Sequence, residues 1–228
     1  MDKRFRRHME CVATEEDSKT FAAKDYVLDD DLIDLVLRDR QPQLRICRPD
    51  EVIVVLGRGS KPGIELNLDV CEADHVNIFR RRGGGCAVVL DPGDIIVSLA
   101  LPASGFGRIR EHFDAISNWL IDGLEGAGIK GVHREGTSDL AIDNRKIAGA
   151  SMQRKRDLVF YSCSILVRPR VDLMERWLGH PPREPGYRHH RTHSDFVGSL
   201  ASQRGGEDID ALAEKMRSLL KTDALRDI

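Results

Sequence analysis

The spacing of hydrophobic residues predicts a chain that mixes strands and helices. A strand is predicted at residues 44–47, and another at residues 52–56, a short run rich in β-branched residues that is typical of a buried strand. Over residues 108–125 the apolar positions recur at helical spacing, and Gly126 and Gly128 follow where the helix is expected to end. The pattern therefore already contains both periods, two residues for strands and about 3.6 for helices.

Two pairs of apolar runs enclose turn residues and predict β-hairpins. Residues 86–90 and 95–99 flank the sequence Asp-Pro-Gly-Asp, and residues 139–142 and 145–147 flank Asp-Asn. Another strand is predicted over residues 158–167. Because strands and helices mix without a strict βαβ rhythm, the expected fold class is α+β and not a Rossmann sheet.

The remaining segments define the limits of the domain. Residues 1–26 are polar and irregular, so we expect a disordered N-terminal segment and a single domain over residues 27–228. A helix is expected to begin at residues 29–31, whose carboxylates suit a helix N-terminus, and residues 179–194, rich in Pro, Arg and His, predict a loop. An amphipathic helix is expected at the C-terminal end, with its apolar face formed by Ile209, Leu212, Met216 and Leu219.

The charge balance narrows the classes of partner. With 35 Lys and Arg against 37 Asp and Glu, the net charge of −2 argues against a nucleic-acid binder. No apolar run approaches the ~20 residues of a membrane helix, and no apolar region follows the basic N-terminus as in a secretory signal. Five scattered cysteines without a CxxC spacing exclude a zinc ribbon and favour a reducing, cytoplasmic location.

The first candidate for chemistry is the sequence RRRGGGCAV at residues 80–88. Glycines let backbone N–H groups approach an anion closely, and arginines supply forked donors for phosphate or carboxylate. The structural alternative is a tight turn beside a solvated basic run. The second candidate is Lys146, which is followed by a small residue and Gly149 and can lie along a ligand groove. Its alternative is one more exposed surface lysine.

Two other groups of residues are weaker candidates. Residues 189–193 contain three histidines, but the loop has no supporting Cys or carboxylate pattern, so a surface loop is favoured over zinc. Cys86 and Cys163 are potential nucleophiles, although cysteines between apolar strand positions are usually buried and inert.

Three blocks in order carry a resemblance to a known family. They are VVLGRGSKPGIELN at residues 54–67, RRRGGGCAVVLDPGD at residues 80–94 and SDLAIDNRKIAGAS at residues 138–151. Together they resemble the lipoate–protein ligase family, within the superfamily of biotin ligases and octanoyl transferases, over about residues 28–200. The chain departs from the family's pattern at Leu90, Asp94 and residues 161–164, where the family often has His, Asn and His-His-Gly-Thr.

The resemblance implies a catalytic domain with a mixed β-sheet flanked by helices. ATP, Mg²⁺ and lipoate (or octanoate) would form an acyl-AMP, and no metal site made by protein groups alone is expected. Lys146 would bridge the acid and the α-phosphate, and Asp139 would orient either Lys146 or the metal. The residues expected to bind ATP and the acyl-adenylate are Arg81, Gly83, Gly84, Gly85, Cys86, Ala87, Val88, Val89 and Gly149.

The implied partner is a lipoyl carrier domain, from a 2-oxoacid dehydrogenase E2 or a glycine cleavage H-like protein. Arg188 and Arg191, in an arginine-rich loop, are expected at the rim that meets the carrier or the ligand. The length leaves no room for the C-terminal accessory domain of many full ligases, so we expect a short form whose accessory part is absent or a separate subunit.

Two other functions stay open. An octanoyl or lipoyl transferase of the same fold would use a cysteine thioester and no ATP. Residues 130–136 contain no cysteine, which favours adenylation, but Cys86 and Cys163 keep the transferase open. A non-enzymatic lipoyl-binding or scaffold protein is the third alternative.

Overall fold

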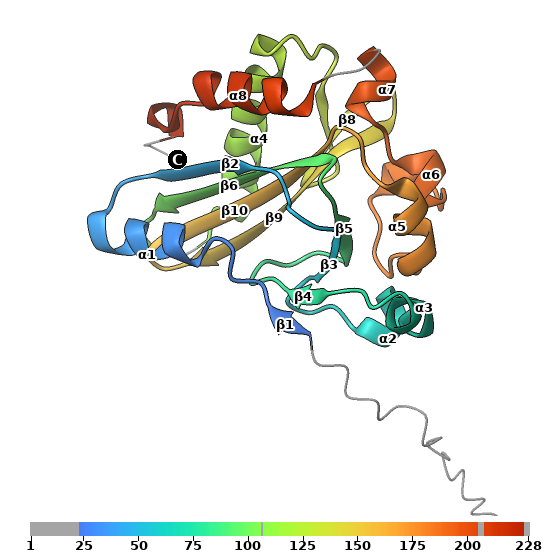
Figure 1. The fold of residues 1–228 in the computed structure, drawn as a ribbon. Coiled ribbons are helices and arrows are strands. Elements are labelled where there is room, and N and C mark those ends of the chain that lie inside the picture. The colour runs from blue at the N-terminus through green and yellow to red at the C-terminus, as the bar shows by residue number, and fades with distance from the viewer. Residues whose placement is uncertain (1–22, 106, 205–207, 226–228) are drawn as a thin grey trace, which may run out of the picture.

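The computed structural model describes residues 23–105, 107–204 and 208–225, and it divides the strands between two sheets (Figure 1). The larger sheet has six antiparallel strands in the order β2-β6-β10-β9-β8-β7. Its strands are β2 (Gln43–Cys47), β6 (Asp94–Pro102), β7 (His133–Glu135), β8 (Asp139–Ile142), β9 (Arg145–Lys155) and β10 (Leu158–Leu166).

The smaller sheet has four strands in the order β1-β4-β3-β5. They are β1 (Lys24–Asp25), β3 (Ile53–Leu56), β4 (Ile78–Arg80) and β5 (Val88–Leu90). The first three are parallel to one another and β5 is antiparallel to β3, so this sheet is mixed and the predicted α+β class is confirmed. β1 lies inside the predicted irregular segment of residues 1–26; the rest of that segment, up to residue 22, is outside the described residues.

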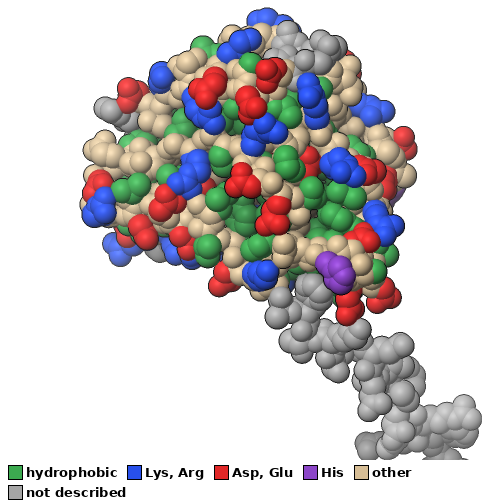
Figure 2. Space-filling model, viewed as in Figure 1, with side chains coloured by type: hydrophobic (Ala, Val, Ile, Leu, Met, Phe, Trp, Pro, Cys, Tyr) green, Lys and Arg blue, Asp and Glu red, His purple; other side chains and the backbone are tan. Residues whose placement is uncertain are grey.

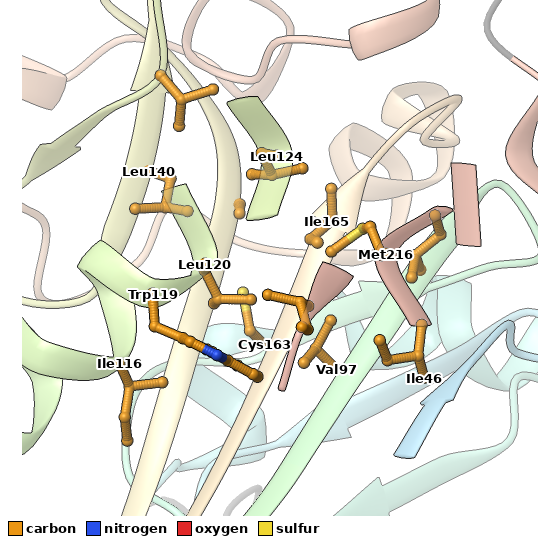
Figure 3. Packing of buried hydrophobic residues seen from close by; sticks show 14 of the residues in the cluster. Ile46, Val97, Ile116, Trp119, Leu120, Leu124, Leu140, Cys163, Ile165 and Met216 are labelled. Carbon is orange, nitrogen blue, oxygen red and sulfur yellow. The ribbon is translucent and has the colours of Figure 1, made fainter. Parts of the chain in front are cut away.

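Helices α4 (Ile109–Gly126) and α8 (Ile209–Leu219) cover one face of the larger sheet (Figure 1). Side chains alternate along a strand, so every second residue of β10 points toward these helices. The β10 side chains in this core are Val159, Tyr161, Cys163 and Ile165. They pack with residues of α4 and α8, such as Leu120 and Met216, in the main hydrophobic core of the domain (Figure 3).

The opposite face of the larger sheet is covered over only part of its length. There α1 (Asp30–Asp39) packs Leu32, Ile33 and Val36 against Ala100, Leu158 and Phe160. Farther along β10, the residues on this face are Ser162 and Ser164. Small polar side chains leave the sheet face open at this point.

The smaller sheet packs against short helices. These are α2 (Pro62–Glu65), α3 (Leu68–Ala73) and α5 (Val171–Trp177). Apolar residues of α3 and α5, with Leu66 directly after α2, form a second core with β3 and β5. The other described helical turns are η2 (Gly186–Arg188), α6 (His193–Phe196), α7 (Leu200–Arg204) and η3 (Thr222–Leu225). None of the described helices is long and apolar enough to cross a membrane.

One of the two predicted hairpins is confirmed and the other is wrong. β8 and β9 pair across Asp143 and Asn144, whose φ angles of 48° and 60° suit a two-residue hairpin turn. β5 and β6 do not pair, because β5 joins β3 in the small sheet and β6 lies between β2 and β10. The turn between them instead carries the chain from one sheet to the other, and Asp91 holds it by accepting from the Gly93 and Arg170 amides at 2.6 and 2.8 Å.

The predicted helices form with small differences. The expected helix over residues 108–125 is α4, and the C-terminal helix is α8. Leu219 is 44% exposed, and Leu220 takes the buried position at that end. Asp29 precedes α1 but does not cap it, since its buried carboxylate accepts from the Ser98 hydroxyl at 2.9 Å.

Asp94, at the start of β6, makes the stability of the fold depend on pH. The residue is fully buried, and its Oδ1 has no partner among the described residues. Burial, together with the negative charge of Asp91, raises the pKa of Asp94 well above its usual value. The folded state therefore binds this proton more tightly than the unfolded chain, and the free energy of unfolding falls as the pH rises above about 4 toward the folded-state pKa.

We expect Asp94→Asn to be more stable than the parent at pH 8, by about 1–3 kcal/mol, because it removes a buried charge that lacks a full set of partners. The advantage should shrink at pH 5, where more of the parent carries the proton. Urea unfolding at the two pH values measures this difference. Asp91→Asn is the control and should lose stability at both, because it replaces an acceptor of two backbone N–H groups. An equal loss for Asp94→Asn at both pH values would contradict the expectation.

Candidate functional site

A cavity of about 760 Å³ lies between the two sheets. The exposed face of the larger sheet lines it with Gly149, Ser162 and Ser164, and the smaller sheet contributes β5 and the glycine-rich loop before it. Residues 179–197 form a further wall. Three parts of the chain that are distant in sequence therefore meet around one space.

An extra residue in β9 decides which side chains face this cavity. Asp139 pairs with Gly149 and Leu140 with Ala148, but the next residue of β8, Ala141, pairs with Lys146. Ile147 is thus the additional residue of a β-bulge and packs into the main core together with its neighbour Ala148. The bulge places Lys146 on the same side of the sheet as Gly149, although the two are three residues apart.

Lys146 and Asp139 form an ion pair inside the cavity. The Lys146 ammonium lies 2.9 Å from Oδ1 of Asp139, and the other carboxylate oxygen accepts a hydrogen bond from the Tyr187 hydroxyl at 3.0 Å. The Lys146 side chain passes directly over Gly149, where a Cβ atom would come within 2.6 Å of its Cε and Nζ. The pair therefore needs glycine at position 149, and a quarter of the lysine side chain stays accessible.

The three consecutive arginines before the glycines all have partners within the chain. Arg80 donates to the carbonyl groups of Gly57 and Ser60, and Arg82 pairs with Asp30. Arg81 is half-buried and donates to three carbonyl groups, those of Val55, Gly84 and Cys86. Burial lowers the pKa of Arg81 to about 10, yet the guanidinium stays charged at neutral pH.

The glycine-rich loop is shaped by close contacts with its neighbours. A Cβ atom at Gly57 would lie 1.9 Å from the Gly85 carbonyl oxygen, and one at Gly83 would lie 2.7 Å from Oγ of Ser151. Gly85 has a φ of 92°, which favours glycine. Gly84 is different, since a Cβ atom there would meet nothing within 4 Å.

Glu65 is a buried carboxylate that holds the same loop from the other side. It accepts hydrogen bonds from the Ser60 hydroxyl at 2.8 Å and from the Ala87 amide at 2.6 Å. A buried carboxylate is stabilised by such donors, and here they fix the backbone where β5 begins. Glu65 lines the cavity, so it contributes both structure and negative charge to the site.

The wall formed by residues 179–197 contains Arg188 and Arg191, the two arginines expected at a rim. Arg188 is only 5% exposed and lines the cavity, with its guanidinium 4.8 Å from the centre of the Phe196 ring. Arg191 donates to the carbonyl groups of Asn144, Tyr187 and Arg188. Burial lowers the pKa of Arg188. A contact of Arg188 or Arg191 with a carrier stays a prediction, and the burial of Arg188 favours a ligand inside the cavity.

The two candidate cysteines lie in different places. Cys86 is half-buried in the glycine-rich loop and lines the cavity. Cys163 points the other way, into the core under α4 and α8, and burial raises the pKa of its thiol to about 12 (Figure 3). A thiol in that environment stays protonated and shielded, so Cys163 is a poor nucleophile.

The cavity brings together most of the predicted site residues. Those that line it are Arg81, Gly85, Cys86, Ala87, Val88, Val89, Asp139, Lys146, Gly149 and Arg188. Gly83, Gly84 and Arg191 do not line it. Sequence reasoning missed Glu65 and Tyr187. Glu65 contacts Ala87 across 22 residues of chain and Tyr187 contacts Asp139 across 48, so no local pattern marks these contacts.

On the face shown in Figure 2, Lys and Arg side chains are mixed with Asp and Glu, and hydrophobic side chains come to the surface between them.

Three residues of the loop, His180, Glu184 and His190, lie close enough to hold a metal ion. The two histidines instead contact the Glu184 carboxylate, at 2.9 and 3.1 Å.

Comparison with known proteins gives a consistent set of relatives. Residues 21–221 match the family model of the lipoyl protein ligase A/B catalytic domain. Lipoate-protein ligase A of Psychrobacter cryohalolentis is 28% identical over 131 residues, which are 57% of this chain and 36% of that protein. An octanoyl-[GcvH]:protein N-octanoyltransferase of Exiguobacterium sibiricum is 27% identical over 142 residues, 59% of this chain and 52% of that protein. The matched stretch thus spans about a third of the first relative and half of the second.

Solved structures share the fold. A lipoate-protein ligase A bound with ATP superposes with a TM-score of 0.70 and 19% identity, over 85% of this chain and 78% of that one. A bipartite lipoate protein ligase from Thermoplasma acidophilum, described with its E2 lipoyl domain, gives a TM-score of 0.69 and 20% identity, over 85% and 76% of the two chains. The two-sheet arrangement therefore agrees with solved proteins of this fold.

The contact between Gly57 and Gly85 gives a test of the loop's structure. We expect Gly57→Ala to lower the free energy of unfolding by about 1–3 kcal/mol, because its methyl group would overlap the Gly85 carbonyl oxygen. Gly59→Ala is the matched control, since a Cβ atom at Gly59 meets nothing within 4 Å. Urea unfolding of both variants measures the difference, and equal midpoints would show that the loop can move away without cost.

Proposed function

The chain belongs to the family of lipoyl protein ligase A/B catalytic domains, and from this premise we propose that it is a lipoate–protein ligase. It would activate lipoate, or octanoate, with ATP and transfer the acyl group to a lysine of a lipoyl carrier domain. The observation that carries the proposal is the Lys146 ammonium, held by Asp139 on the open face of the larger sheet.

This ammonium group suits the joining of a carboxylate to a nucleotide. A carboxylate and a triphosphate repel each other, and a positive charge between them lowers that repulsion and stabilises the charge that develops on the α-phosphate. The carboxylate oxygen of the acid would attack the α-phosphorus and pyrophosphate would leave, forming an acyl-AMP. The amine of the carrier lysine would then attack the acyl carbon and AMP would leave.

The cavity has room and groups for both substrates. Its volume of about 760 Å³ falls within the ~300–1,000 Å³ typical of ligand pockets. Apolar residues of the lining that cluster together, including Val55, Leu90 and Ile96, suit an acyl chain. Lys146 and the glycine-rich loop suit the carboxylate and phosphates. We therefore assign the apolar cluster to the acyl chain and Lys146 to the acid carboxylate and the α-phosphate.

Mg²⁺ would enter with the nucleotide. Magnesium prefers oxygen ligands and is commonly held by substrate phosphates with one or two carboxylates. In the cavity, both oxygens of Asp139 have partners, and Glu65 accepts from Ser60 and Ala87. These carboxylates fit a metal that is held mainly by ATP, with Asp139 as the carboxylate nearest to Lys146.

The carrier partner is proposed by analogy with relatives. One structural neighbour is described with its E2 lipoyl domain, and one relative is named for transfer from GcvH to protein. The same structural neighbour is a bipartite ligase, which supports the proposal that an accessory part resides on a second subunit. An E2 lipoyl domain and a glycine cleavage H-like protein are therefore the carriers to test first.

A transferase is the second candidate because Cys86 lines the cavity and one relative is an octanoyltransferase. The thiol of Cys86 lies 3.5 Å from the Arg183 carbonyl oxygen, and no histidine or aspartate of the described residues forms a hydrogen bond with it. The Arg81 guanidinium donates to the Cys86 carbonyl group and so places a cation near the thiol, but a nucleophilic cysteine usually also has a general base beside it. We therefore favour the ligase.

Lys146→Ala should lower the rate of lipoyl-AMP formation from lipoate and ATP at least about a hundredfold, because the site loses the positive charge proposed to face the α-phosphate. Pyrophosphate release measures the reaction. Urea unfolding is the control for folding. The variant should lose some stability, because the buried Asp139 keeps only the Tyr187 hydroxyl, but it should still unfold cooperatively, since Lys146 lies outside the hydrophobic cores. Activity within a factor of two of the parent would refute the assignment of Lys146.

Cys86→Ser should keep most of the lipoylation of a purified carrier domain with lipoate and ATP, because the ligase needs no thiol. The parent should form no acyl-thioester when incubated with an octanoylated carrier and no ATP. Mass spectrometry of the intact protein measures this. A trapped thioester on Cys86 in the parent, lost in the variant together with turnover, would favour the transferase.

A further inference from the structure

Tyr187 reaches the ion pair from outside the cavity. Its hydroxyl donates to Oδ2 of Asp139 at 3.0 Å, and Tyr187 itself does not line the cavity. Asp139 is buried, and its two oxygens have one donor each, Lys146 on Oδ1 and Tyr187 on Oδ2. Without the Tyr187 hydroxyl, Oδ2 of Asp139 would have no hydrogen-bond donor among the described residues.

The tyrosine is itself held in place by the wall of the cavity. Its ring centre lies 5.0 Å from that of Phe196, and its carbonyl oxygen accepts from Arg191 at 2.7 Å. The guanidinium groups of Arg188 and Arg191 lie 4.8 and 5.2 Å from the centre of the same Phe196 ring. The hydroxyl is therefore presented by a packed segment and not by a free loop.

The same segment is joined to β9 beside Lys146. Val197 bridges to Lys146, and the Gly198 amide donates to the Lys146 carbonyl oxygen at 2.8 Å. Residues 187–198 thus hold both the Lys146 backbone and Asp139, the ion partner of the Lys146 side chain. This arrangement leaves the ammonium group little freedom to leave Asp139.

We propose that Tyr187 is a positioning residue whose hydroxyl fixes the Asp139 carboxylate and, through it, the Lys146 ammonium group. The catalytic consequence rests on the proposed ligase function. Burial and the negative charge of Asp139 raise the pKa of Tyr187 above its usual value, so the hydroxyl keeps its proton and acts as the donor. A hydrogen bond to a charged group is worth more than one between neutral groups, which gives the contact enough energy to set the geometry.

Tyr187→Phe tests the proposal because it removes only the hydroxyl and keeps the ring against Phe196. We expect kcat for lipoyl-AMP formation to fall about tenfold, while KM for ATP and lipoate stays within about a factor of two. Lys146 should also react several times faster with acetic anhydride, measured by mass spectrometry of the peptide. Tyr161→Phe is the matched control. It removes a tyrosine hydroxyl in the main core, on the other face of the larger sheet, so kcat and the labelling of Lys146 should not change.

A second pair of variants isolates the path through Asp139. In an Asp139→Asn background, adding Tyr187→Phe should have less than a twofold further effect on labelling, because the hydroxyl acts through the carboxylate. An unchanged labelling rate in Tyr187→Phe, or a full additional effect in the double variant, would overturn the proposal. If the parent is active, an unchanged kcat in Tyr187→Phe would also overturn the proposal. If the parent forms no adenylate, the proposed function fails, and the labelling alone then decides the role of Tyr187.

Discussion

The bulge at Ile147 is the constraint on which the candidate site depends. In a regular β9, Lys146 and Ala148 would share one face and Gly149 would lie on the other. The extra residue sends both Ile147 and Ala148 into the main core and leaves Lys146 beside Gly149 over the cavity. Burying an isoleucine contributes roughly 1.5–3 kcal/mol, so the core fixes the register that the site requires.

The charged groups of the site divide into those that build it and those that face a ligand. Arg80, Arg81 and Glu65 bind backbone carbonyl and amide groups of the loops, and each such contact offsets part of the cost of removing a charge from water. Lys146 remains partly accessible and pairs with the Asp139 carboxylate. The run of three arginines is thus mainly structural, and Lys146 is an accessible cation beside the open face of the larger sheet.

How much the sequence predicts depends on how local each interaction is. The hairpin of β8 and β9 is fixed by a two-residue turn, and the helices by their own periodicity, so both could be predicted. The turn at Asp91 has equally good hairpin chemistry, but the strands beside it find partners in different sheets. Turn residues report the direction of the chain and not the identity of the strand that pairs with it. Tyr187 and Glu65 could not be predicted for the same reason, since their contacts exist only after both sheets have assembled.

The position of the cavity at the junction of the two sheets connects its chemistry to the stability of the fold. The smaller sheet has its own core. Among the described segments, the turn at Asp91 and the wall of residues 179–197 connect it to the larger sheet. A ligand that contacts β5, β9 and this wall at once would add contacts between parts that otherwise meet across a space. Binding to the folded state alone raises the free energy of unfolding in proportion to the logarithm of ligand concentration. The ion pair of Lys146 and Asp139, held by Tyr187 from the wall, already joins the larger sheet to the wall without a ligand. The same residues that would orient the substrates therefore also hold the wall against the larger sheet.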